Sequence, residues 1–128
     1  MSARLQYAKV IDQELFLNEN ARIHPGLNNA IQLHDEPGKA GAFLVLRGWQ
    51  DGHGTVTEQW RIEGSGGGKV YESLPREVHL PTAGHLEKLE DEINDLEFQY
   101  AADDYHIVFT IDEREVARVK FEVRSPKD

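Results

Sequence analysis

Histidines beside carboxylates are the side chains of this sequence that most directly offer chemistry. Residues 34–36 (His-Asp-Glu) and 51–53 (Asp-Gly-His) each place an imidazole next to a carboxylate. Such pairs can transfer protons or contribute to a metal site. None of the six histidines has the H-x-H or H-E-x-x-H spacing that prepares a zinc site. Both segments are therefore predicted to be turns, and a ligand or metal site would need distant residues to converge. The residues of that alternative site are His34, His53, His79 and Trp49.

Residues 64–69 (Gly-Ser-Gly-Gly-Gly-Lys) have the composition of a phosphate-binding loop but not its pattern. That loop needs a glycine five positions before its last glycine, and a Ser or Thr after the lysine. Here those positions hold Glu63 and Val70. We therefore expect a flexible connector.

Other catalytic and metal-binding motifs are missing as well. No serine stands in a G-x-S-x-G elbow, and there are no cysteines. The acidic pairs Asp103-Asp104 and Asp112-Glu113 lack the D-x-D-x-D-G ladder of a calcium loop. The sequence thus predicts no catalytic residue, no metal and no cofactor.

The charge is acidic and unevenly distributed. The net charge is −9, which has the wrong sign for the basic surface that nucleic-acid binding requires. Residues 85–104 hold eight acids and a single lysine, so this segment is either a solvated face or a surface for a basic partner. The acids of that predicted interaction surface are Glu87, Glu90, Asp91 and Asp95.

A β-hairpin at the carboxyl end is the clearest structural element. Residues 105–111 and 117–123 both alternate apolar and polar side chains, and Asp112-Glu113-Arg114 separates the two runs. This period of two predicts two antiparallel strands with one buried face. A single hairpin cannot bury that face alone, so it must belong to a larger sheet.

Further strands are predicted upstream. Residues 42–49 are apolar on both faces until Arg47, which favours a central strand, and residues 55–63 alternate as its hairpin partner. Pro75 interrupts residues 69–80, which favours a sheet edge. Shorter or bent strands are expected at residues 8–18, 30–33 and 96–100.

One helix is predicted near residues 83–94, within the segment 82–95. Leu86, Leu89, Ile93 and Leu96 recur at three- and four-residue spacing, as in one apolar stripe of a helix. Glu87 and Asp91 repel each other at the same spacing, so this helix needs packing to be stable.

Together these elements predict a mainly β protein, an antiparallel β-sandwich of seven or eight short strands with one inserted helix. Trp60 lies on a middle strand, and Tyr105 begins a late strand with Ile107 two positions on. Over residues 42–123 the chain resembles immunoglobulin-like domains, among them small uncharacterised bacterial immunoglobulin-like proteins. The resemblance implies that the Tyr105 hydroxyl bonds backbone upstream. The sequence departs from the pattern in having an aliphatic residue where a cysteine would stand.

The length of 128 residues favours a single domain over residues 1–128. No run approaches the length of a membrane span, and the first residues lack the apolar run of a signal peptide. The expected protein is soluble and cytoplasmic, and it binds neither membrane nor nucleic acid.

Three functional hypotheses remain open, the third of which is a structural subunit of a larger assembly with a broad exposed apolar patch. The first is a non-enzymatic interaction module that binds a protein partner, or itself as a homodimer, through an edge strand or the acidic helix. Residues 69–80 and 8–18 are the edge candidates. The second is a small-ligand or metal-binding protein, or an enzyme, with the His and carboxylate site named above.

Overall fold

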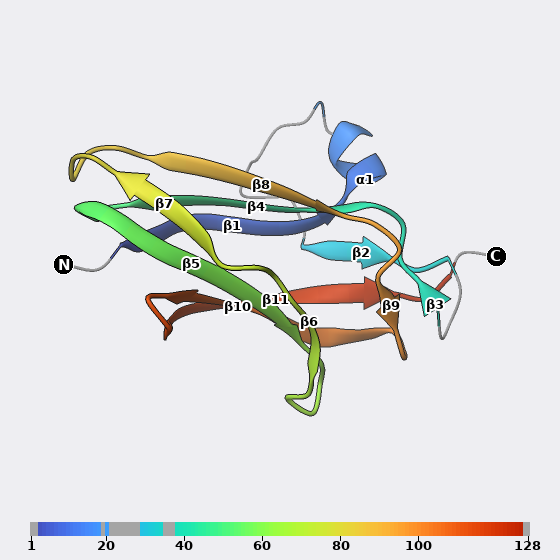
Figure 1. The fold of residues 1–128 in the computed structure, drawn as a ribbon. Helices are drawn as coiled ribbons and strands as arrows, with labels where there is room; N and C mark the ends of the chain where they lie inside the picture. The colour runs from blue at the N-terminus through green and yellow to red at the C-terminus, as the bar shows by residue number, and fades with distance from the viewer. Residues whose placement is uncertain (1–2, 19, 21–28, 35–37, 127–128) are drawn as a thin grey trace.

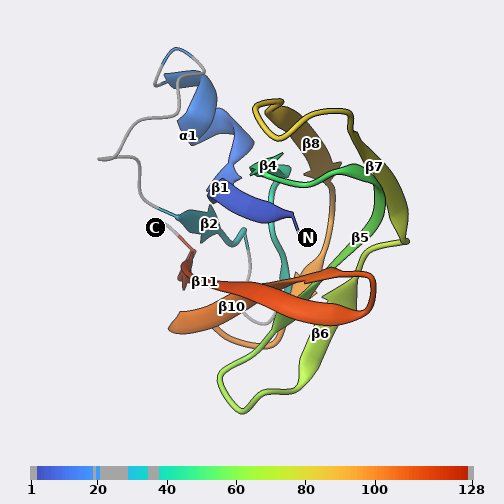
Figure 2. The same ribbon diagram turned by 90° about the vertical axis from the view of Figure 1, so that its left-hand side faces the viewer.

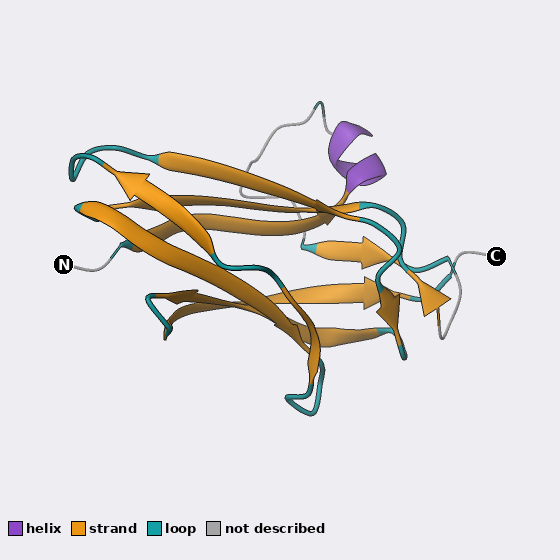
Figure 3. Cartoon of the chain, in the orientation of Figure 1, coloured by secondary structure: helices purple, strands orange, loops and turns teal. Residues whose placement is uncertain are grey.

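The chain folds into short strands and, in the part described, one short helix (Figures 1 and 3). A computed structural model describes residues 3–18, 20, 29–34 and 38–126. The elements in chain order are β1 (Arg4–Asp12), α1 (Gln13–Asn18), β2 (Ala30–Gln32), β3 (Gly38–Lys39), β4 (Phe43–Gln50), β5 (Gly54–Glu63), β6 (Lys69–Glu72), β7 (Arg76–Leu80), β8 (Glu87–Ile93), β9 (Glu97–Phe98), β10 (Ala102–Ile111) and β11 (Arg114–Arg124).

The carboxy-terminal hairpin is confirmed as β10 and β11, which pair antiparallel along most of their length. Its inward side chains join the core, and Phe109 and Phe121 are almost completely buried. The connecting turn has two residues, Asp112 and Glu113, and both have positive φ. Two positive φ values are typical of the hairpin turn whose twist matches the strands. Asp112 also fixes the turn to β5, because its carboxylate accepts a hydrogen bond from the Thr57 backbone at 2.9 Å.

Nine strands form one mixed sheet, in the order β6-β5-β10-β11-β2-β1-β4-β8, with β7 also paired to β5. All neighbours are antiparallel except β1/β2 and β2/β11, which are parallel. The sheet curls so that β1, β4 and β8 lie opposite β10 and β11 (Figure 2). The strands β3 and β9 form a separate two-stranded sheet. The prediction of a mainly β protein is confirmed, but the strand pairing is not purely antiparallel.

The strand β4 is buried on both faces, as its apolar sequence predicts. The prediction that residues 55–63 are its hairpin partner is wrong, because β4 pairs with β1 and β8 whereas β5 pairs with β6, β7 and β10. Phe43, Val45 and Trp49 point into the main core between the opposing parts of the sheet. Leu44 and Leu46 point to the other side, where they form a second cluster with Ile11 and Phe16 beneath α1. The helix α1 therefore covers an apolar patch that would otherwise face water. No helix within the described residues is long and apolar enough to cross a membrane.

The prediction of a helix near residues 83–94 is wrong, because residues 87–93 form the strand β8. Their exposure alternates, with Leu89, Asp91 and Ile93 turned inward and Lys88, Glu90 and Glu92 exposed. A charged side chain at an inward position concealed the period of two. The backbone ladder with β4 outweighs the weak helical preference of a segment with repelling acids.

The amino-terminal prediction also needs correction. The strand predicted at residues 8–18 ends at Asp12, and the helical segment is α1. The strand β1 is not an edge, since β2 and β4 flank it. The described residues hold eleven strands rather than seven or eight. Part of the excess arises because residues 69–80 break at Ser73–Pro75 into β6 and β7, which do lie at the sheet edge as predicted.

The predicted hydrogen bond of Tyr105 is confirmed. Its hydroxyl donates to the Tyr100 carbonyl oxygen at 2.6 Å, and its ring stacks on Phe121 and packs edge-on to Phe98. This contact fastens the chain entering β10 to the core.

The turn between β10 and β11 generates a stability prediction. Glu113 has a φ of 72° although it is not glycine, asparagine or aspartate. The left-handed region costs such a residue roughly 1–2 kcal/mol. We expect Glu113→Gly to raise the free energy of unfolding by about 1 kcal/mol in urea denaturation. The control Lys120→Gly, within β11, should lower it by about 0.5–1 kcal/mol. Destabilisation by both variants would contradict the turn geometry.

Candidate functional site

The two ends of the nine-stranded sheet meet at β7 and β8. These strands are consecutive in the chain, but β7 pairs with β5 and β8 pairs with β4. From their connection they diverge towards β6 (Figure 1). Between them lies a groove of about 490 Å³, which we call the seam groove. Its lining residues are Arg47, Glu58, Trp60, Tyr71, Ser73, Leu74, Pro75, Arg76, Glu90, Asp91, Glu92 and Ile93.

A buried ion pair forms the floor of the seam groove. Arg47 of β4 and Glu58 of β5 are 0% and 1% exposed. The Arg47 guanidinium donates to both oxygens of the Glu58 carboxylate, from Nε to Oε2 at 2.9 Å and from Nη2 to Oε1. Its third nitrogen, Nη1, donates to the Val45 carbonyl oxygen. Trp49 Nε1 donates to the same carboxylate. Because two buried charges lose their hydration, only this complete set of partners makes the burial tolerable.

Asp91 connects this floor to the surface. Its carboxylate accepts from Trp60 Nε1 at 2.8 Å and from Arg76 Nη2 at 2.8 Å, and it lies 3.1 Å from Arg47 Nη1. Arg76 is on β7, so the contact crosses the groove from one sheet edge to the other. Among the described residues, β7 and β8 are bridged by side chains rather than by a backbone ladder. An inward charge on an edge strand is a known protection against uncontrolled strand pairing.

The rims of the groove differ in character. On one rim, Leu74 is 86% exposed and Pro75 follows it, while Tyr71 is half-buried with its ring centroid 5.5 Å from that of Trp60. On the other rim, Glu90 and Glu92 are exposed. An apolar rim therefore faces an acidic rim across the groove.

The predicted acidic surface is brought to this groove, but not as one helical face. Glu90 and Asp91 line the groove, with Glu90 exposed and Asp91 turned inward. Glu87 is half-buried and lies 2.7 Å from His85 Nε2. Asp95 is exposed in the turn after β8, with a φ of 59°. Two of the three segments predicted as interaction surfaces, residues 69–80 and the acidic segment 86–96, thus lie on opposite sides of one groove, whereas residues 8–18 do not line it.

The four residues of the alternative site, His34, His53, His79 and Trp49, do not come together in the structure. His34 lines a second cavity of about 500 Å³ with Asp12, Glu14 and Arg124, and its neighbours Asp35 and Glu36 lie outside the described residues. His53 and His79 are exposed near the other end of β4, which at ~3.3 Å per residue spans roughly 26 Å. Trp49 is a core residue bonded to Glu58. No group of three or more His, Asp or Glu that could hold a metal occurs among the described residues.

Sequence reasoning missed the buried network of Arg47, Glu58 and Asp91. A signal was present, because Arg47 interrupts an apolar run and Glu58 stands between Val56 and Trp60 on the inward face. Opposite charges at inward positions of consecutive strands indicate a buried pair.

Comparison with known proteins shows a similarity of fold alone. No family model and no curated protein matches it. Among solved structures, it is similar to the alkylpurine DNA glycosylase AlkC of Pseudomonas fluorescens, with a TM-score of 0.55 and 11% identity. The match covers 96% of this chain and 30% of that one. A glycosyl hydrolase family 2 member of Bacteroides cellulosilyticus gives a TM-score of 0.49 and 14% identity, over 74% of this chain and 15% of that one.

The buried pair generates the first prediction for this site. Arg47→Met should lower the free energy of unfolding by about 3–5 kcal/mol, because Glu58 loses its buried counter-charge. Adding Glu58→Gln removes that charge, so the double variant should lose less than the sum of the two single losses. Urea unfolding of all three measures the coupling. As a control, Arg61→Met on the outer face should cost no more than about 1 kcal/mol. Strict additivity would refute the coupling.

The outer face of β5 and β11 generates a pH prediction. Hydrogen bonds from Arg61 at 2.7 Å and Arg118 at 2.9 Å lower the pKa of Glu63 below 4.5, and Arg61 is the main cause. Because the folded-state pKa is lowered, this stabilisation is present above pH 4.5 and is lost as pH falls through the folded pKa. Glu63→Gln should therefore cost up to about 1 kcal/mol at neutral pH and progressively less in acid.

The measurement for Glu63 is urea unfolding of the protein and of Glu63→Gln across an acid pH series. Glu77→Gln, at an exposed acid of β7, is the control for loss of one negative charge. A Glu63→Gln cost that stays constant with pH would show that the ion pairs contribute nothing.

Proposed function

We propose that this chain is an immunoglobulin-like β-sandwich domain that acts as a non-enzymatic interaction module. Three observations support the fold assignment: the hydrogen bond of Tyr105 to upstream backbone, Trp60 in the core on β5, and the pairing of β5, β10 and β11 opposite β1, β4 and β8. The similarity to part of AlkC concerns the fold of one β-rich region and carries no information about activity.

The observation that carries the functional proposal is the seam groove. It is the place where the two sheet edges face each other, and two of the three segments predicted as interaction surfaces, residues 69–80 and 86–96, line it. The charged side chains of its floor are paired with one another, whereas Leu74 is exposed on one rim and Glu90 and Glu92 on the other. Glu92 also accepts hydrogen bonds from the side chains of Gln13 and Asn94. A site whose buried charges are satisfied internally is better suited to docking a partner than to proton transfer.

Comparative affinity capture tests this function. The tagged protein, a Glu90→Lys/Glu92→Lys variant and an Asp103→Lys/Glu113→Lys control are used to capture partners from native lysate, followed by mass spectrometry. We expect a protein captured by the wild type and the control to be lost from the groove variant, because that variant reverses the charge of one rim. Capture that is equal for all three variants would contradict the groove as the docking surface.

A small-ligand function is the second candidate, and one observation favours it. The cavity at His34 brings Asp12, Glu14 and Arg124 into the same concave surface, a mixture of charges that suits a polar metabolite. Native mass spectrometry of the purified protein distinguishes the two functions. A retained small molecule that is lost in a His34→Ala/Arg124→Ala variant would support the second function.

A further inference from the structure

The strand β8 has one paired edge and one edge that borders the seam groove. It pairs with β4 over seven residues, and no other strand pairs with it in the described part of the chain. Such an edge presents backbone N–H and C=O groups that another extended chain can pair with. We propose that the seam groove binds an extended segment of a partner protein, with alternating basic and apolar side chains, as an added strand on β8.

This inference rests on the proposed interaction function and specifies its partner. The open part of the edge is its second half. Residues 81–86 hold β7 and β8 together at one end, and the two strands diverge from there (Figure 1). The groove is lined on the β8 side by residues 90–93 only. A segment of about four residues would therefore fit against the open edge, at ~3.3 Å per residue.

The charges on β8 determine the basic positions of the segment. Glu90 and Glu92 are exposed on the same face of the strand. Residues directly opposite each other on neighbouring strands point to the same face, and opposite charges there are stabilising. Lysine or arginine therefore belongs opposite Glu90 and Glu92.

The groove itself determines the apolar position. The inward Asp91 already accepts from Trp60 and Arg76 and lies beside Arg47, so it needs no further cation. A side chain between the two basic residues would share the inward face of Asp91 and so lie over the groove, whose lining includes Tyr71 and Leu74. Leu74 is 86% exposed, and an apolar residue would cover part of it.

A second copy of this chain is a poor occupant of the same edge. The strand β8 carries four acids and one lysine within Glu87–Ile93. Pairing two such strands would place acids close to acids across the new interface, which is destabilising. Charge complementarity thus selects a basic partner over self-association.

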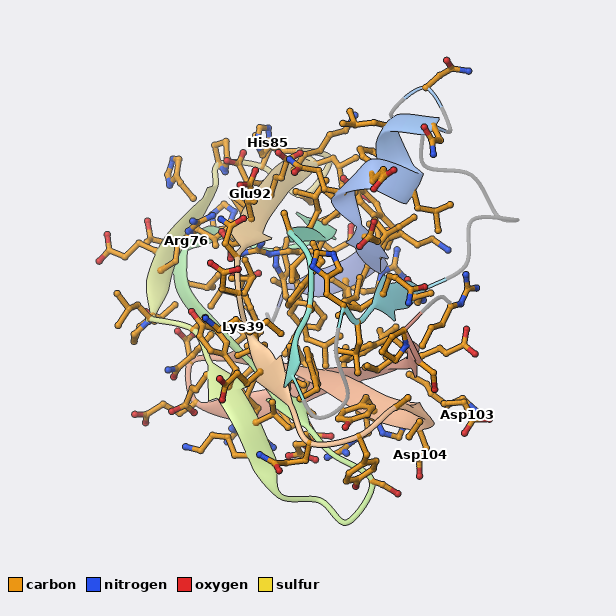
Figure 4. The ribbon with its side chains drawn as sticks, turned by 90° about the vertical axis from the view of Figure 1, so that its right-hand side faces the viewer. Lys39, Arg76, His85, Glu92, Asp103 and Asp104 are labelled. Carbon is orange, nitrogen blue, oxygen red and sulfur yellow. The ribbon has the colours of Figure 1, made fainter. Side chains whose placement is uncertain are left out.

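The test uses the full chain and synthetic peptides. The first peptide alternates lysine and valine; the second has the same side chains but N-methyl groups on alternate backbone nitrogens; the third alternates glutamate and valine. Binding is measured by calorimetry, and hydrogen exchange reports on the amides of residues 90–93. The protein variants are Glu90→Lys/Glu92→Lys and the control Asp103→Lys/Glu113→Lys. Figure 4 shows Asp103 on the opposite side of the molecule from Glu92 and Arg76.

Of the three peptides, we expect only the unmodified lysine–valine peptide to bind and to slow hydrogen exchange at the amides of residues 90–93. The groove variant should weaken this binding about tenfold or more, equivalent to 1.4 kcal/mol or more, and the control variant should leave it within about twofold. Equal binding of the N-methylated peptide would overturn strand addition. Equal binding to the groove variant, or a dimer of the free protein whose exchange is slowed at the same residues, would overturn the choice of partner.

The two proposals can fail separately. If none of the peptides binds but lysate capture still depends on Glu90 and Glu92, the partner chemistry inferred here is wrong and the interaction function stands. If capture is indifferent to those residues, the function fails as well.

Discussion

The buried contact between Arg47 and Glu58 is the constraint on which the rest of this structure depends. Both groups lie in the interior between opposing parts of the sheet, where an unpaired charge would cost several kcal/mol. Each partner fixes the other, and Trp49 and the Val45 carbonyl fill the remaining hydrogen-bonding positions. Because the pair joins β4 to β5, the two parts of the sheet can pack in only one register without leaving a charge unsatisfied.

The same network determines how the sheet ends. Asp91 extends it from the floor of the groove to Arg76, so that β7 and β8 are held by side chains and not by a backbone ladder. The two edges remain separated enough to form a groove, and the inward carboxylate protects β8 against indiscriminate pairing. The proposed interaction function rests on this protected but open surface, and the exposed acids on one rim are the reason for proposing a basic partner.

The sequence predicted the most regular strands but not the structure of residues 8–18 and 87–93, nor which strands pair. The hairpin of β10 and β11 follows from apolar alternation, and the double burial of β4 follows from its apolar run. The bond from Tyr105 was expected only from the resemblance to immunoglobulin-like domains. Asp91 made residues 87–93 resemble a helix, because Leu89 and Ile93 then appeared as every fourth residue rather than as part of an alternating strand. The segments 69–80 and 86–96 were singled out from the sequence, but the groove between them was not foreseen.

Local composition and periodicity determined that this chain is mainly β, that residues 42–49 lie in the interior, and that residues 69–80 lie at an edge. These properties depend on residues that are close in the sequence, because they follow from whether apolar and polar side chains alternate along a single strand. Only the tertiary structure determined that β1 and β2 run parallel, that Arg47 meets Glu58 and Asp91, and that His34 stays apart from His53. Those pairings join residues that are distant in the sequence, and long-range contacts are selected by the free energy of the whole packed interior, which no short stretch of sequence contains.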